Sequence, residues 1–213
     1  SRPLIAALVA LPAVLLSRFV WTERPELFGF VCFALLVILL RAARDGNLRA
    51  LLACAPLVAL WANLHGSFAL GVVLLGLVSL EGALAQRPRR GRYALAFALG
   101  ALASLLNPAG VGAWTAPGSH FLDPPRGILE WSVPDVTHPA GLLCTLALGL
   151  GAASAGCGDA PRLREAVVLV PLLFLALTAT RQLPFFVIAA TPFLARHLPE
   201  ALARLGAAIG LRA

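Results

Sequence analysis

Long apolar stretches, separated by short polar connections, recur along the whole chain. Each stretch has about the length that a helix needs to cross roughly 30 Å of hydrocarbon. Runs such as FVCFALLVILL lack the alternation of apolar and polar positions that strands of a membrane barrel show, whereas a helix pairs its own backbone amides in lipid. The pattern predicts an all-α bundle of about eight transmembrane helices, at residues 3–20, 27–42, 48–63, 67–85, 92–107, 139–156, 165–179 and 183–198.

The connections between these stretches define the predicted domains. We expect residues 1–199 to form one transmembrane helical domain and residues 200–213 to form a short amphipathic tail on the cytoplasmic surface. The connection at 107–138 is much longer than the others, and long connections are usually functional or disordered. Because it carries two tryptophans and the apolar run ILEW, we expect it to be an ordered segment at the outer membrane interface.

The composition supports this fold class. Hydrophobic residues make up 60% and charged residues 13% of the 213-residue chain, against about 45–50% and about 25% in globular proteins. So little polar surface cannot cover a core that faces water, which excludes a soluble globular domain, a disordered chain and a disulfide scaffold. The chain contains no Met, so we expect it to be a fragment of a longer protein and to lack the N-terminal part.

The net charge of +7 is explained by topology. Arg18, Arg24, Arg126 and Arg181 lie on one predicted side of the membrane, and all other arginines, including the run RPRRGR, lie on the opposite side. Cytoplasmic connections of membrane proteins carry an excess of basic residues. We therefore place both termini and the RPRRGR run in the cytoplasm, and we expect membrane lipids, not nucleic acid, as partners.

Polar residues with binding chemistry gather in the predicted outer connections. Arg24, in SRFVWTERPELF, precedes a predicted helix start and either belongs to a solvated loop or binds a phosphate headgroup. Asn63 and His65, in LWANLHGSFALG, either form a helix turn or face a cavity. Arg181, in TATRQLPFF, either extends to the interface by snorkelling or faces a lipid-linked phosphate.

Two carboxylates complete the candidate set. Glu130 and Asp135 flank Trp131 in ILEWSVPD. Two carboxylates and a histidine can supply a general base or hold a divalent cation, although the spacing does not require a metal. The alternative is a loop anchored by Trp131. The candidates are, for catalysis, Glu130, Asp135 and His65, and, for substrate binding, Arg24, Asn63, Trp131 and Arg181.

The succession of RPELF, LWANLHGSFALG, LLNPAG, ILEWSVPD and RQLPFFVIAATP resembles a broad group of bacterial polytopic membrane proteins related to the GT-C superfamily. The similarity covers nearly the whole chain. It implies a glycosyltransferase of the inner membrane that moves a sugar from a polyprenyl-phosphate-linked donor at the outer face. By this resemblance, Arg24 and Arg181 would contact the donor phosphate. The acceptor or metal region would be lined by Asn63, His65, Glu130 and Asp135.

The chain departs from the GT-C pattern at one point. In that superfamily an acidic residue in the first outer loop typically acts as the base or as a metal ligand. If the chain begins partway through its parent protein, this loop lies upstream, and Glu23 and Glu26 are the local substitutes. Two other functions stay open. A transporter would place charged groups near the middle of the membrane, and a non-catalytic scaffold would tolerate substitution of the candidate residues.

Overall fold

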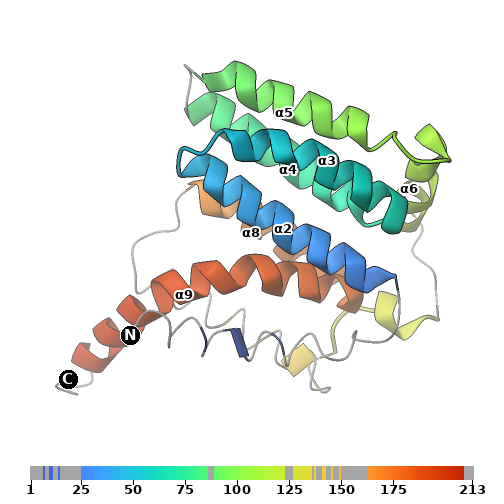
Figure 1. Ribbon diagram of the computed structural model, residues 1–213. Helices are drawn as coiled ribbons and strands as arrows, with labels where there is room; N and C mark the ends of the chain where they lie inside the picture. Colours follow the sequence, from blue (N-terminus) through green and yellow to red (C-terminus); the bar gives the residue numbers. More distant parts are fainter. Residues whose placement is uncertain are drawn as a thin grey trace. The chain divides into compact units, whose positions relative to one another are not determined.

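The computed structural model describes residues 25–85, 89–122, 127–135 and 163–208, with single positions near the N-terminus and between 137 and 149. All regular elements in these residues are helices, which confirms the predicted all-α class (Figure 1). The chain divides into two compact units. We call residues 23–125 the central unit, and residues 1–22 with 126–213 the terminal unit.

The central unit is built from four long helices joined by short turns. The helices are α2 (Glu26–Arg44), α3 (Arg49–Leu64), α4 (Phe68–Ala85) and α5 (Arg90–Ala103). The turns at 45–48 and 65–67 are so short that each of α2, α3 and α4 must run antiparallel to the helix that follows or precedes it. Helix α3 packs against each of the other three, and α4 also packs against α5 (Figure 1).

Glycine ends the first of these helices. The backbone N–H of Gly46 donates to the carbonyl of Ala43 at 3.1 Å, and that of Asn47 donates to Ala42 at 2.9 Å. This pair of bonds is the Schellman arrangement, which needs a residue with positive φ after the helix. Gly46 has a φ of 109°, and glycine adopts that conformation without a steric penalty. The chain therefore turns sharply here and leads directly into α3.

Glycines on α4 allow the helices to approach closely. Trp61 and Tyr93 are fully buried, and their rings lie against Gly71 and Gly82, at positions where a Cβ atom would overlap them. Small residues at helix contacts are typical of membrane bundles, in which close backbone approach replaces the hydrophobic effect as the driving force. Trp61 thus belongs to the packing of the central unit.

Helix α2 has an exposed apolar face. Phe28, Val31, Leu35 and Ile38 are all about half exposed or more, and their spacing of three and four residues places them on one face of the helix. By length and composition, α2 and α4 could each cross a membrane, whereas α3 is apolar but shorter. Such a continuous exposed apolar stripe suits contact with hydrocarbon.

The terminal unit contains one long helical hairpin. Helix α8 (Leu163–Thr178) leads through the short 3-10 helix η5 (Thr180–Gln182) into α9 (Leu183–Ala208), and a second 3-10 helix, η4 (Leu129–Trp131), packs against η5. Glu165, in the first turn of α8, lies 3.5 Å from Arg196 and 3.4 Å from His197 of α9. Helix α9 continues without a break through residue 200, where the sequence suggested a separate tail.

The described helices cover nearly the same residue ranges as the predicted ones. The predicted stretches at 3–20 and 139–156 fall almost entirely outside the described residues. Helix α5 ends at Ala103, earlier than the predicted end at 107. The reason is local, because Pro108 disfavours helical backbone at Asn107, and the Asn107 side chain donates a hydrogen bond to the carbonyl of Ser104 at 2.8 Å.

Candidate functional site

Asn63 joins two helix ends in the central unit. Its side-chain amide donates to the carbonyl of Ala59, within α3, at 2.8 Å and to the carbonyl of Leu106, beyond the end of α5, at 2.7 Å. The first bond is made within α3, and the second joins the end of α3 to the segment that follows α5. Asn63 thus connects two segments of the central unit, and its role in substrate binding stays a prediction.

His65 belongs to a hydrogen-bond chain that starts α4. The Nδ1 atom of His65 accepts a hydrogen bond from the backbone N–H of Ser67 at 3.1 Å. It also lies 2.7 Å from the Ser67 hydroxyl, and that hydroxyl accepts a hydrogen bond from the Trp61 indole at 3.1 Å. Since Nδ1 acts as an acceptor, we assign the proton of the neutral ring to Nε2. The arrangement stabilises the turn between α3 and α4, while catalysis by His65 stays a prediction.

The long connection after α5 begins with two short helices. It contains the 3-10 helix η3 (Gly110–Trp114) and helix α6 (Thr115–Leu122). Trp114 donates from its indole N–H to the Ser104 hydroxyl at 3.2 Å and packs edge-on against Phe68, with ring centroids 5.1 Å apart. One of the two tryptophans that suggested an ordered segment therefore fixes the segment to the end of the helical unit.

Glu130, Trp131 and Arg181 meet in the terminal unit. The guanidinium carbon of Arg181 lies 4.3 Å from the centroid of the Trp131 ring. The nearest oxygen of Glu130 lies 4.0 Å from an Arg181 nitrogen, and the two side chains are 30% and 18% exposed. These three candidates, which come from connections far apart in the sequence, form what we call the Arg181 cluster.

The backbone around the Arg181 cluster is held by Thr180. Both its N–H, at 2.9 Å, and its hydroxyl, at 3.0 Å, donate to the carbonyl of Ser132. The two bonds join η4 to η5 directly beside Trp131 and Arg181. Sequence reasoning did not find Ser132 and Thr180, because nothing in either connection shows that the two connections meet. Ser67, by contrast, had a signal, since it follows His65 by two residues in a turn.

Electrostatics and stacking together orient the Arg181 guanidinium. A distance of 4.0 Å is longer than a hydrogen bond, so the attraction to Glu130 is mainly coulombic. Stacking on an indole ring is the preferred cation–π geometry and fixes the plane of the guanidinium. The result is a partly buried, oriented cation with a carboxylate beside it, which suits recognition of a phosphate group.

Asp135 forms a local turn. Its Oδ1 atom accepts hydrogen bonds from the backbone N–H and from the hydroxyl of Thr137, both at 2.8 Å, as in the turns that Asp commonly forms. Within the described residues, no group of three or more His, Cys, Asp or Glu side chains could hold a metal ion. A metal pair of Glu130 and Asp135 is thus not supported by any third ligand in that part of the chain.

The remaining candidate, Arg24, lies outside the described residues, as does Glu23. Glu26, the other local acid considered as a substitute for the upstream one, is buried in the first turn of α2. No protein-family model matches the chain, and neither does any curated protein or solved structure.

Proposed function

We propose that this chain is part of a multi-pass protein of the bacterial inner membrane that binds the phosphate of a polyprenyl-phosphate-linked sugar and transfers the sugar at the outer face. The observation that carries the proposal is the Arg181 cluster, with its guanidinium 4.3 Å from the Trp131 ring and 4.0 Å from the Glu130 carboxylate. The resemblance to GT-C proteins supports the choice of donor.

An oriented arginine is well suited to a phosphate donor. The planar guanidinium presents paired N–H donors that match two phosphate oxygens, and such charge-assisted pairs are stronger than neutral hydrogen bonds. Because Trp131 already holds the guanidinium plane, less conformational freedom is lost on binding. Partial burial also strengthens the attraction to an anion by lowering the effective dielectric constant.

The transfer itself requires a proton acceptor. An acceptor hydroxyl attacks the anomeric carbon of the donor sugar, the bond from that carbon to the phosphate oxygen breaks, and polyprenyl phosphate leaves with the bonding electrons. Arg181 would stabilise the charge on the leaving phosphate, and Glu130 would take the proton of the acceptor hydroxyl.

The distribution of charge favours this function over transport. In α2, α3, α4 and α5 the charged side chains lie near the helix ends, such as Arg44 in the last turn of α2 and Glu81 towards the end of α4. A transporter usually carries polar or charged groups on broken helices near the middle of the membrane. The apolar length of α2 and α4 and the exposed stripe on α2 support the membrane placement, from which we infer eight spans with cytoplasmic termini.

Binding of a polyprenyl phosphate to the full chain tests the proposal. The chain would be reconstituted in nanodiscs that contain phosphatidylglycerol. This lipid would occupy any site that binds anionic lipids in general, so that the measured binding reports sites that prefer polyprenyl phosphate. We expect Arg181→Ala to weaken binding about tenfold or more, the loss of one charge-assisted contact, and Arg181→Lys to weaken it less. Radiolabelled sugar transfer from a panel of polyprenyl-phosphate sugars should fall in Glu130→Gln, which keeps the side-chain shape but removes the base.

Arg196→Ala is the matched control. Arg196 also pairs with a glutamate, Glu165, at 3.5 Å and lies in the same unit, but it is separated from Arg181 by about 20 Å along α9. It should bind polyprenyl phosphate like the wild type. If Arg181→Ala folds, inserts and binds as well as Arg196→Ala, the Arg181 cluster is not a phosphate site and a scaffold function is favoured instead.

A further inference from the structure

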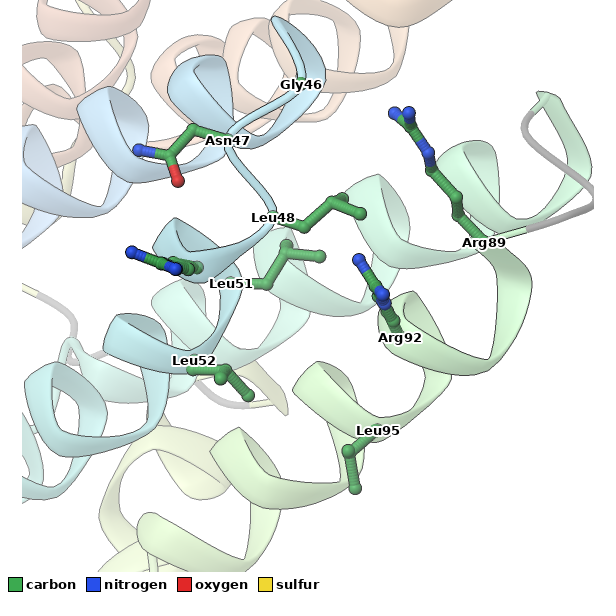
Figure 2. A pocket seen from close by; sticks show the side chains of 9 residues that line it. Gly46, Asn47, Leu48, Leu51, Leu52, Arg89, Arg92 and Leu95 are labelled. Carbon is green, nitrogen blue, oxygen red and sulfur yellow. The ribbon is translucent and has the colours of Figure 1, made fainter.

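A surface pocket of about 670 Å³ lies at one end of the central unit (Figure 2). It is formed by the turn between α2 and α3 and by the first turns of α3 and α5. Its size is typical of pockets that hold small molecules or headgroups. The pocket lies between the 45–48 turn, which arginines flank in α2 and α3, and the arginine-rich connection before α5. The sequence placed both on the cytoplasmic side.

The pocket is strongly cationic. Arg49, Arg89 and Arg92 line it, and Figure 2 shows the side chains of Arg89 and Arg92 extending from the start of α5 towards the turn at Leu48. No carboxylate is among the lining residues. Within the described part of the chain, neither Arg49 nor Arg92 forms an ion pair. The described residues therefore do not neutralise Arg49 and Arg92 by ion pairing.

The two helix starts add to the positive potential. Helices α3 and α5 both begin at the pocket, neither has a side-chain cap, and neither has an acidic residue in its first turn. The first backbone N–H groups of a helix carry a partial positive charge and attract anions. Together with the three arginines, they create a site for an anion at this end of the unit.

The apolar part of the pocket indicates an amphiphilic ligand. Leu52 and Leu95 also line the pocket and are 54% and 50% exposed. Each lies three residues after an arginine, Arg49 or Arg92, and hence about one helical turn further from the connections. A ligand with a phosphate at the arginines would thus place its apolar part along these leucines, towards the middle of the helices.

We propose that this pocket binds the phosphate headgroup of an anionic phospholipid of the inner leaflet. Basic pockets between transmembrane helices on the cytoplasmic side bind such headgroups. Charge, pocket size and the neighbouring apolar surface all match this ligand. The inference rests on the proposed membrane placement of the chain but not on sugar transfer. Its test uses residues of the central unit, whereas the donor site is tested at Arg181, so each proposal can fail without the other.

Lipid retention by the full chain tests the proposal. The protein would be stripped of lipid in a neutral detergent and titrated with phosphatidylglycerol, and bound lipid would be counted by native mass spectrometry. We expect Arg89→Ala/Arg92→Ala to weaken binding by at least about tenfold, since two charge-assisted contacts are lost. Both side chains are exposed, so folding, checked by thermal unfolding, should not change.

The control removes the same charge from the same end of the unit. Arg41 and Arg90 are exposed and do not line the pocket, and Arg41→Ala/Arg90→Ala should change binding less than about twofold because solvent screens such charges. Equal loss in both double variants, or no loss in Arg89→Ala/Arg92→Ala, would overturn the proposal. Displacement of the lipid by excess inorganic phosphate would also overturn it, because the ligand would then be a soluble anion.

Discussion

Polar residues of similar type play different parts in this molecule, and their contacts distinguish them. His65 accepts a hydrogen bond from Ser67 that stabilises a turn, and Asn63 donates hydrogen bonds that join α3 to the segment after α5. Arg181, in contrast, is held by an aromatic ring and by a carboxylate that is too distant for a hydrogen bond. Orienting an arginine in this way costs conformational entropy, and the oriented guanidinium is what a phosphate-binding residue would need.

Single glycines should matter as much as polar residues for stability. In Gly71→Ala, the added methyl group would overlap the fully buried Trp61 ring, and overpacking of this kind costs about 1–3 kcal/mol. We expect a lower melting temperature of the purified chain in detergent. Gly91→Ala is the control, because a Cβ atom there meets nothing within 4 Å. A Gly71→Ala protein as stable as Gly91→Ala would contradict the packing described for α3 and α4.

At the scale of the elements, the sequence predicts helices well and their contacts poorly. Helices α2 and α4 begin and end within two residues of the apolar stretches 27–42 and 67–85, because apolar length and flanking charges are local signals. Helix α5 is shorter than predicted, because the apolar pattern continues to residue 107 whereas Asn107 and Pro108 oppose a helix there.

Contacts between connections have no local signal. Glu130 and Arg181 are both recognisable as candidates from residue type alone, yet only the packing of η4 against η5 brings them together. Asn63 is another example. The sequence predicts a polar residue at a turn, but its hydrogen bond to the Leu106 carbonyl depends on where α5 packs, which the local sequence does not show. The pocket at Arg89 and Arg92 has no local signal either. In the sequence these arginines indicate only which side of the membrane the connection faces.

The link between α2 and α4 can be tested by substitution. Arg44 and Glu81 form an ion pair at 3.1 Å, and each side chain is only 11% exposed. Removing Glu81 takes a carboxylate away from a largely buried guanidinium, so we expect Glu81→Leu to destabilise the chain by roughly 3 kcal/mol. Arg44→Met/Glu81→Leu, which removes both charges, should recover most of this loss in melting temperature. If the double variant is no more stable than Glu81→Leu, the pair does not join the helices as described.

On the scale of the whole molecule, charge and apolar surface are distributed as a membrane requires. Arginines of the connections beside α2, α3 and α5 gather at one end of the central unit, where they line a pocket. The α3–α4 turn and the segment containing Trp114 lie at the opposite end of α3. If the arginine-rich end faces the cytoplasm, we expect the Arg181 connection, which follows an odd number of predicted spans from it, to face outwards, as α6 does.

Cysteine labelling of the intact membrane tests this arrangement most directly. Single cysteines would replace Asn47, Ser119 and Thr178, which are all exposed, in a chain whose native cysteines are removed. We predict that a membrane-impermeant maleimide labels Ser119→Cys and Thr178→Cys in intact spheroplasts, and labels Asn47→Cys only after permeabilisation. Labelling of Asn47→Cys in intact spheroplasts, or protection of Thr178→Cys together with Asn47→Cys, would contradict a membrane protein whose phosphate-binding arginine faces outwards.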